Sequence, residues 1–152
     1  MNWQQWEPFY LQILNKMGYD MEKDREAALL LRELLLENEN YILAENIKER
    51  IEERVYVFGA GPSLEKKLER REFGGTLISS DGATSALLEN GIVPHIIVTD
   101  LDGNFEDIKR ANGLGAYVVV HAHGDNIDKL KHYVPKLKNV LGTCQTEPLD
   151  II

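Results

Sequence analysis

From residue 55 onward, short apolar runs alternate along the chain with more polar stretches of helical character. The apolar runs are rich in Val and Ile and lack polar alternation, which is typical of strands covered on both faces of a sheet. Helical stretches between consecutive strands indicate right-handed crossovers and a mainly parallel sheet. The predicted strands are VYVFG (55–59), TLISS (76–80), HIIVTD (95–100), YVVVH (117–121) and NVLGT (139–143). The pattern predicts an α/β fold with a Rossmann-like, doubly wound layout.

Residues 1–54 have a different pattern, with Gly18 as their only glycine. They predict three helices, around residues 3–17, 25–38 and 41–54. The middle helix carries the run AALLLRELLL (27–36), which is apolar on nearly every side and indicates burial on more than one side or a contact in a homo-oligomer. We therefore expect an N-terminal helical cap (1–54) followed by the α/β core (55–152). Aromatic residues on the first helix are interpreted as core packing or a subunit contact: Trp3, Trp6, Phe9 and Tyr10.

The composition is that of an ordinary globular protein, with 43% hydrophobic and 28% charged residues in a chain of 152. The net charge of -8, with basic residues scattered among acids, argues against binding to nucleic acid. Cys144 is the only cysteine, which excludes an intrachain disulfide and a thiolate zinc site and favours a reducing compartment, the cytoplasm. The first residues do not read as a secretion signal, and no apolar run approaches the roughly 18–20 residues that cross a bilayer, so no membrane association is expected.

Small, acidic or imidazole residues follow almost every predicted strand, in the segments GAGPS, DGATS, DLDGN, HAHGDN and GTCQT. The carboxyl ends of parallel strands meet at one edge of the sheet, and ligands of such folds bind there beside a topological switch point. We therefore expect these five segments to form one site. The chain ends a few residues after the fifth predicted strand, which would leave a poorly covered edge, so we expect a truncated polypeptide.

The segment GAGPSLE lies between a predicted strand and a predicted helix. Gly59 and Gly61 let the backbone approach a phosphate, and Pro62 suits the first turn of the helix. Leu64 occupies the position where a dinucleotide fingerprint needs Gly or Ala, and a Walker loop would need a Lys. We interpret the segment as a general phosphate or substrate loop; a tight turn with no ligand is the alternative.

Asp100 and Asp102, in VTDLDG, are two residues apart at a strand end, so in extended geometry their carboxylates project from the same side. Adjacent carboxylates repel unless a cation or protons intervene, and hard oxygen ligands beside a phosphate suit Mg²⁺. Asp81 follows the neighbouring strand and either joins this acidic group or caps the next helix. The alternative for the pair is that one Asp caps a helix and the other is solvated.

The segment HAHGDN offers His121 and His123 in the same alternation, followed by Asp125. A zinc pair would lack a third His or a Cys nearby, so proton transfer or a phosphate contact is the preferred interpretation. Asp125 is either a third magnesium ligand or the cap of a helix that begins near Ile127.

Taken in order, the segments VFGAGPSLE, SSDGATSALLENGIVPHIIVTDLDG, VVHAHGDN and LGTCQTEP resemble the archaeal 6-hydroxymethyl-7,8-dihydropterin pyrophosphokinases, the MptE-like family. The resemblance covers roughly residues 55–148. More distantly, the chain is similar to the catalytic domain of thiamin pyrophosphokinases. The resemblance implies an enzyme that transfers a diphosphate from ATP, with Mg²⁺, to the hydroxymethyl group of the pterin alcohol, giving AMP, in folate or tetrahydromethanopterin biosynthesis.

Carried over by position, the resemblance implies a metal site at Asp81, Asp100, Asp102 and Asp125. It implies that His121 and His123 contact phosphates or help move the hydroxyl proton. The implied nucleotide and substrate contacts are Gly59, Gly61, Pro62, Ser63, Asp81, Gly82, Ala83, Thr84, Asn126, Thr143 and Gln145. The chain departs from the family pattern at His95, where an acid is common, and at Cys144, where a Thr is usual. A further segment rich in Gly and Asp, which helps complete the site in the family, is not part of this sequence.

The residues alone leave two other functions open. An acid pair of the D-x-D type also holds a divalent ion against a nucleotide sugar in metal-dependent glycosyltransferases, and motility accessory proteins are related through this same domain. The other alternative is a Rossmann-like binding module without catalysis.

Overall fold

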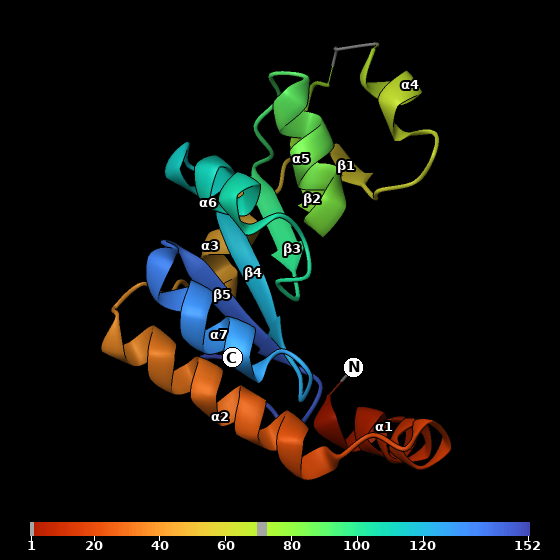
Figure 1. Ribbon diagram of the computed structural model, residues 1–152, viewed down its shortest axis with the longest axis vertical. Coiled ribbons are helices and arrows are strands. Elements are labelled where there is room, and N and C mark those ends of the chain that lie inside the picture. The colour runs from red at the N-terminus through yellow and green to blue at the C-terminus, as the bar shows by residue number, and fades with distance from the viewer. Residues whose placement is uncertain (1, 70–72) are drawn as a thin grey trace.

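The computed structural model describes residues 2–69 and 73–152, and in these ranges the chain forms a five-stranded parallel sheet with helices around it (Figure 1). Every strand end lies within one residue of its predicted position, and the prediction of a parallel α/β sheet is confirmed. The strands are β1 (Val55–Phe58), β2 (Thr76–Ser80), β3 (Ile96–Thr99), β4 (Tyr117–Ala122) and β5 (Val140–Cys144).

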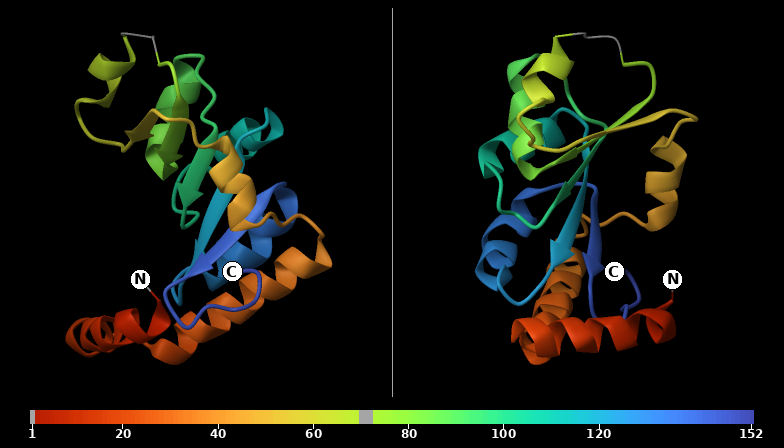
Figure 2. Two further views of the ribbon diagram at one scale, coloured as in Figure 1. Left: turned by 180° about the vertical axis from the view of Figure 1, so that it is seen from behind. Right: turned by 90° about the vertical axis from the view of Figure 1, so that its right-hand side faces the viewer.

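The strands follow one another across the sheet in the order β1-β2-β3-β4-β5. Each crossover therefore moves in the same direction, and right-handed crossovers that do so place their helices on the same face. These helices, α4 to α7, form one layer in Figure 2. Among residues 2–69 and 73–152, the strands therefore do not form the doubly wound layout with a switch point that the sequence predicted. The four helices are α4 (Leu64–Leu68), α5 (Asp81–Glu89), α6 (Phe105–Gly113) and α7 (Ile127–Tyr133), the last followed by a 3-10 turn (Val134–Lys136).

The two faces of the sheet differ in burial. On the helix-covered face, Ile97 and Val118 pair in register and are fully buried. On the opposite face, Val57 is 77% exposed and Val98 is 44% exposed. The expectation that the strands are covered on both faces is thus wrong at these two positions, because no described crossover helix returns on that side; Ile96, on the same face as Val98, is buried.

The first two helices, α1 (Trp3–Met17) and α2 (Met21–Glu37), are joined by Gly18 in the left-handed conformation. Helix α2 begins four residues before its predicted start because the Asp20 side chain accepts a hydrogen bond from the Glu22 N–H at 2.9 Å and caps it. Its apolar residues pack into the core beside α7 and β5 (Figure 1): Ala27, Leu31 and Leu35 are fully buried. Most apolar residues of this run therefore pack against the chain's own core, and a contact in a homo-oligomer stays a prediction.

Residues 40–42 extend the sheet beyond β5. The Ile42 N–H donates to the Val140 carbonyl at 2.8 Å, and the Val140 N–H donates to the Asn40 carbonyl at 2.9 Å. This pairing keeps the segment extended, so the third helix, α3, runs only over Ala44–Arg50 instead of the predicted 41–54. It lies on the face opposite the crossover helices, where the Arg50 guanidinium lies 3.6 Å from the ring centre of Tyr117 (Figure 2).

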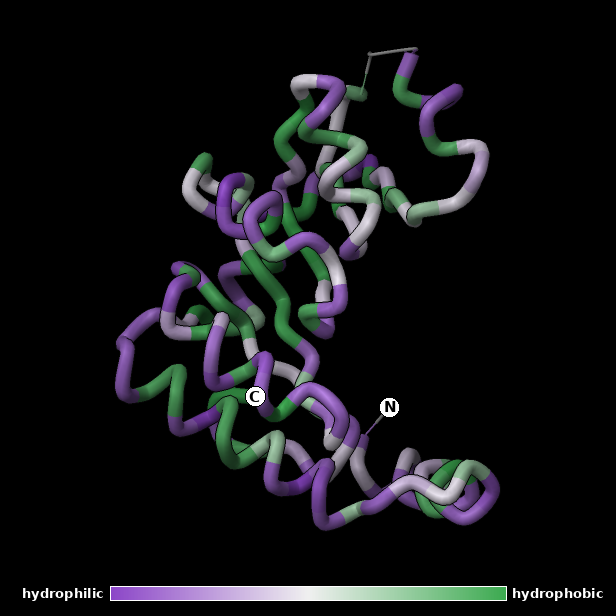
Figure 3. Tube along the Cα trace, in the orientation of Figure 1, coloured by the Kyte–Doolittle hydropathy of each residue, from purple (hydrophilic) through white to green (hydrophobic). Residues whose placement is uncertain are grey.

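The buried apolar residues form two clusters. The larger one joins α2, α6 and α7 to β3, β4 and β5, whereas the smaller one lies under α4 and α5. Figure 3 shows hydrophobic residues concentrated along the strands and the inner helix faces. The smaller cluster consists of Phe58, Leu64, Leu68, Leu77, Ala83 and Leu87. None of the helices in the described ranges combines the length and apolar character that crossing a bilayer requires.

Candidate active site

The loops after the first three strands lie against one another at the carboxyl edge of the sheet. A methyl group at Gly82 would lie 3.1 Å from Cβ of Ala60, and one at Gly103 would lie 2.7 Å from Cβ of Asp81. Glycine is therefore required for the closest of these approaches. The segments GAGPS, DGATS and DLDG are brought together as the sequence predicted.

The GAGPS loop has an open main chain. Its tight turn is closed by a hydrogen bond from the Gly61 N–H to the Gly59 carbonyl at 2.8 Å. Within the described residues, nothing lies within 4 Å of the positions where side chains of Gly59 or Gly61 would begin. Pro62 lies before the N-cap Ser63 and not in the first helical turn as predicted, since α4 begins at Leu64. The exposed backbone of this loop has room for a ligand.

Asp81 is the first residue of α5, whose N-cap is Ser80. Its carboxylate does not cap the helix. It accepts hydrogen bonds from the Thr99 hydroxyl and, at 3.2 Å, from the Gly103 N–H. Burial raises the pKa of this carboxyl above its ordinary value although these hydrogen bonds act in the opposite direction, and the charge of Asp100 raises the pKa further. Asp81 is therefore a part-buried carboxylate whose charge is disfavoured mainly by burial, with the charge of Asp100 close enough to add to the effect.

The extended geometry expected between Asp100 and Asp102 is not formed. Strand β3 ends at Thr99, and Leu101 takes the left-handed conformation (φ 69°) while its side chain is buried. The chain therefore turns between the two acids. Asp102 forms an ion pair with Lys129 of α7. Asp100 accepts a hydrogen bond from the Asp102 N–H at 3.3 Å, and its other oxygen lies 3.7 Å from Nε2 of His123.

His121 is held by Thr143 of the neighbouring strand. The Thr143 hydroxyl donates to the Val120 carbonyl at 3.2 Å and lies 3.1 Å from Nδ1 of His121. The Thr143 hydroxyl can therefore accept a hydrogen bond from a protonated Nδ1 of His121. Burial lowers the pKa of His121, which favours the neutral ring, whereas the Gln145 side chain acts in the opposite direction.

Asn126 ties two of the loops together. Its Nδ2 donates to the carbonyls of Asp100 at 2.9 Å and His121 at 2.8 Å, and its Oδ1 accepts from the His123 N–H at 3.1 Å. The side chain is buried and its amide is occupied by backbone groups, so it orients the loops. Asp125, which does not cap α7, is exposed beside it.

Two residues of the DGATS segment are internal as well. Thr84 is buried, and its hydroxyl bonds to the Ser79 hydroxyl at 2.8 Å and to the Ser80 carbonyl at 3.1 Å. Ala83 is fully buried in the smaller core cluster. Gly82 is exposed, so it is the part of this segment that a ligand can reach.

Asp24, a carboxylate only 5% exposed, is a further residue near the site that the sequence did not predict. It accepts hydrogen bonds from the Tyr10 hydroxyl at 2.7 Å, the Gly124 N–H at 2.8 Å and Nε2 of Gln145 at 2.6 Å. Trp6 adds a bond from its indole N–H to the Gln145 carbonyl at 2.8 Å. The helical cap is thereby joined to the HAHGDN and GTCQT loops. An Asp in the first turn of a helix is common for purely local reasons, so no sequence signal distinguished it.

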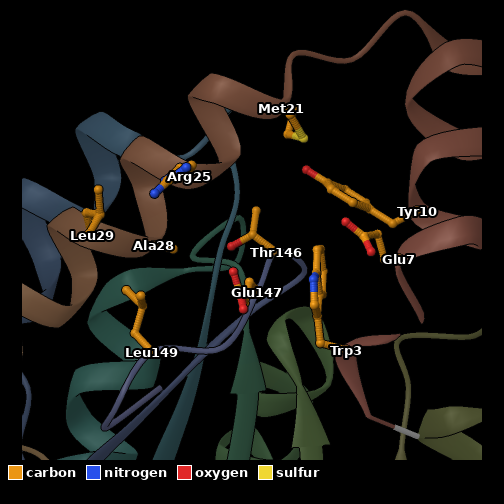
Figure 4. A pocket seen from close by; sticks show the side chains of 10 residues that line it. All are labelled: Trp3, Glu7, Tyr10, Met21, Arg25, Ala28, Leu29, Thr146, Glu147 and Leu149. Atoms are coloured by element: carbon orange, nitrogen blue, oxygen red, sulfur yellow. The ribbon is translucent and has the colours of Figure 1, made fainter. Parts of the chain in front are cut away.

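Two cavities lie on either side of the Tyr10–Asp24 hydrogen bond. One of about 240 Å³ lies between α1, α2 and residues 146–149, and Tyr10 and Trp3 line it (Figure 4). The other, of about 260 Å³, lies between the α1–α2 junction and the HAHGDN loop, and Asp24 and His123 line it. His123, which lines the second cavity, also lies beside Asp100 at the carboxyl edge.

Only some of the acidic residues at the site are free to bind a divalent cation. Asp81 and Asp100 supply the hard oxygen atoms that Mg²⁺ prefers, and their mutual repulsion is the cost that a cation would remove. Asp102 is paired with Lys129, so it joins such a site only if that ion pair opens. Across the described ranges, no three side chains of His, Cys, Asp or Glu lie close enough together to bind one metal ion. The two histidines therefore have no third ligand for zinc among these residues.

His95, the first departure from the family pattern, lies just before β3, at the opposite end of the strand from the site. Its Nδ1 accepts a hydrogen bond from the Leu77 N–H at 2.9 Å. This position stabilises the start of the strand and does not belong to the candidate site.

Comparison with known proteins identifies the family. A family model described as 6-hydroxymethylpterin diphosphokinase MptE-like matches residues 31–151. The chain belongs to the MptE-like family. The match begins within α2, so the family region includes part of the helical cap as well as the whole sheet.

Among curated MptE-like relatives, a 6-hydroxymethyl-7,8-dihydropterin pyrophosphokinase of Pyrococcus furiosus is 56% identical over 153 residues, covering 100% of this chain. Proteins of the same name from Methanocaldococcus jannaschii and Methanothermobacter thermautotrophicus are 49% and 46% identical, covering 95% and 97% of the chain. The chain spans only 65%, 63% and 64% of the lengths of these three relatives.

Proposed function

We propose that the protein to which this chain belongs transfers a diphosphate from ATP to the hydroxymethyl group of 6-hydroxymethyl-7,8-dihydropterin. The hydroxyl oxygen forms a bond to the β-phosphorus, the bond from that phosphorus to the oxygen bridging it to the α-phosphate breaks, and AMP leaves with the electron pair. The names of the relatives give the reaction class and the acceptor. The observation that carries the proposal is the part-buried carboxylate of Asp81, with the charge of Asp100 nearby, beside an open glycine turn.

Asp81 and Asp100 would hold Mg²⁺, with Asp102 and Asp125 completing the site. The bound ion would neutralise charge on the triphosphate and orient it. The backbone of Gly59 and Gly61 would lie against phosphate oxygens.

The hydroxyl proton of the acceptor needs a base. His123 is the proposed proton acceptor because its Nε2 lies 3.7 Å from Asp100, next to the proposed metal site. His121, neutral and fixed by Thr143, would contact a phosphate or relay the proton. We also propose the cytoplasm as the compartment, from the single cysteine and the need for ATP.

Substitution of Asp100 tests the proposal. The full-length protein is incubated with ATP, Mg²⁺ and the pterin alcohol, and AMP is measured. Asp100→Asn should lower turnover by about 100-fold or more, because a charge that stabilises the transition state is lost. Asp128→Asn, an exposed acid of α7, is the matched control and should leave turnover unchanged. Normal AMP formation by Asp100→Asn would contradict the metal assignment, and sugar transfer from a nucleotide sugar without AMP would favour the glycosyltransferase alternative.

A further inference from the structure

The two ends of the carboxyl edge have different chemistry. At the β1 to β3 end, small residues leave the main chain exposed, as the empty space around Gly59 and Gly61 shows. At the β4 to β5 end, imidazole and amide side chains face the helices α1 and α2 across a cavity of about 260 Å³. The first end suits phosphate groups, and the second suits a ring with hydrogen-bonding edges.

The walls of this cavity come from two parts of the chain. Tyr19, Asp20 and Lys23 belong to the α1–α2 junction, and the opposite wall is formed by the sheet loops: His123, Gly124, Asp125 and Gln145. Asp24 lines the cavity as well, and two of its three hydrogen bonds fix Gly124 and Gln145 in place. The cavity is therefore built by a buried polar residue and not by a chance gap between surface side chains.

Several groups around the cavity have spare binding capacity. Within residues 2–69 and 73–152, the side chains of Tyr19, Lys23 and Asp125 make no hydrogen bond or ion pair. Asp20 uses Oδ1 to cap α2, which leaves Oδ2 as a free acceptor. Tyr19 is 53% exposed, a large aromatic surface left open to solvent.

We propose that this cavity binds the acceptor ring: Tyr19 covers one face of a bicyclic 2-amino-4-oxo heterocycle, Asp20 accepts hydrogen bonds from its amino edge, and its hydroxymethyl group faces His123. The inference rests on the proposed function and adds the location and orientation of the acceptor. It places ATP at the β1 to β3 end and the pterin at the β4 to β5 end, with Asp100 between them.

The choice of ring follows from hydrogen-bonding capacity. A carboxylate only accepts hydrogen bonds, and a 2-amino-4-oxo pyrimidine edge offers an amino group and a ring N–H side by side. The corresponding edge of adenine has one amino donor next to an acceptor nitrogen, so a carboxylate there is partly repelled. The free Oδ2 of Asp20 therefore favours a pterin over the base of ATP.

Direct binding of the pterin alcohol, measured by calorimetry without ATP, tests the proposal. Tyr19→Ala should weaken binding about 10-fold through loss of ring stacking. Tyr19→Phe should retain most of the affinity, because the ring face remains. Phe9→Ala is the matched control, since Phe9 is an equally exposed aromatic (56%) on α1 outside the cavity, and it should have no effect.

Asp20→Asn tests the polar contact without removing the helix cap, since Asn caps helices as well as Asp does. Binding of the pterin should weaken about 10-fold, because one acceptor is replaced by a donor. The affinity for ATP with Mg²⁺ should stay the same in all variants. Weaker ATP binding with unchanged pterin binding would overturn the assignment and make this the nucleotide end.

Other outcomes distinguish an error in the location of the pterin from an error in the proposed function. If the unmodified chain binds the pterin and neither Tyr19→Ala nor Asp20→Asn weakens it, the location is wrong and the proposed function stands. If the unmodified chain binds ATP but not the pterin, even with Mg²⁺ and a non-hydrolysable ATP analogue present, both the location and the proposed acceptor are overturned.

Discussion

At the scale of single residues, the carboxylates of this chain differ mainly in what surrounds them. Asp81 was identified from the sequence because it follows a strand, and its hydrogen bonds to Thr99 and Gly103 give it a defined place. Asp24 gave no such signal, since its partners lie 14, 100 and 121 residues away along the chain. The pairing of Asp102 with Lys129 was equally hidden, because it depends on how α7 packs. Position along a strand predicts candidate residues, whereas their partners depend on tertiary contacts.

Asp24→Asn should destabilise the fold. The substitution replaces an oxygen that accepts hydrogen bonds by an amide that donates, so at least one of the three buried bonds is lost. We expect the free energy of unfolding to fall by about 2 kcal/mol. Urea denaturation measures it. Glu26→Gln, at an exposed position of the same helix, should change it by less than about 0.5 kcal/mol.

Folding stability should decrease as the pH falls below 6.5, the ordinary value for a histidine. The pKa of His121 is lowered in the folded protein, mainly by burial, so the unfolded chain binds more protons in the interval between the lowered and the ordinary pKa. Stability then rises with pH through that interval. The nearby charges of Asp100 and Asp24 oppose the effect, and His123 reinforces it.

Denaturation curves at several pH values, compared between the unmodified chain and His121→Gln, measure this contribution. The variant should have a shallower dependence below pH 6.5. An identical dependence in both proteins would show that His121 is not the group responsible.

At the scale of elements, the strands and the first helix were predicted well because their patterns are local. Continuous apolar runs mark β1 to β5, and Gly18 ends α1. The third helix was predicted too long. Residues 40–42 have no sequence feature that excludes a helix, and only their pairing with β5 keeps them extended. Contacts between distant elements again explain what the pattern could not provide.

Gly124→Ala should loosen the contact between α2 and the HAHGDN loop. A methyl group there would lie 2.7 Å from Cβ of Lys23, so the loop must shift and the bond to Asp24 lengthens. We expect a loss of about 1–3 kcal/mol in the free energy of unfolding. Gly113→Ala, in α6, has nothing within 4 Å of the new methyl group and should stabilise the chain slightly or leave it unchanged. Equal effects of the two changes in thermal melts would argue against this contact.

At the scale of the whole molecule, winding in a single direction leaves part of one sheet face uncovered. The sequence predicted a doubly wound layout because continuous apolar strands are usual in sheets with helices on both sides. The apolar character of Val57 and Val98 is present, yet the described chain provides no crossover helix above them. Strand order is a property of the global arrangement and cannot be read from the run of residues within each strand.

The same substitution on the two faces should therefore have different effects. Val118→Thr buries a hydroxyl at a fully buried position and should lower the free energy of unfolding by about 1–3 kcal/mol. Val57→Thr, at a side chain 77% exposed, should change it by less than about 0.5 kcal/mol. Chemical denaturation of both variants provides the comparison. A large loss for Val57→Thr would mean that something covers this face in solution.

The division of the core into two clusters implies that the site rests on two units of different local stability. Six buried residues support the glycine turn, whereas the Asp24 junction is attached to the much larger cluster. Regions with fewer buried contacts open at lower free energy, and amide hydrogen exchange detects such openings separately. The proposed nucleotide end should thus fluctuate while the pterin end stays closed. Nucleotide binding would then slow amide hydrogen exchange chiefly in β1 and β2. Ordering of the glycine turn by ATP would be a step distinct from recognition of the pterin.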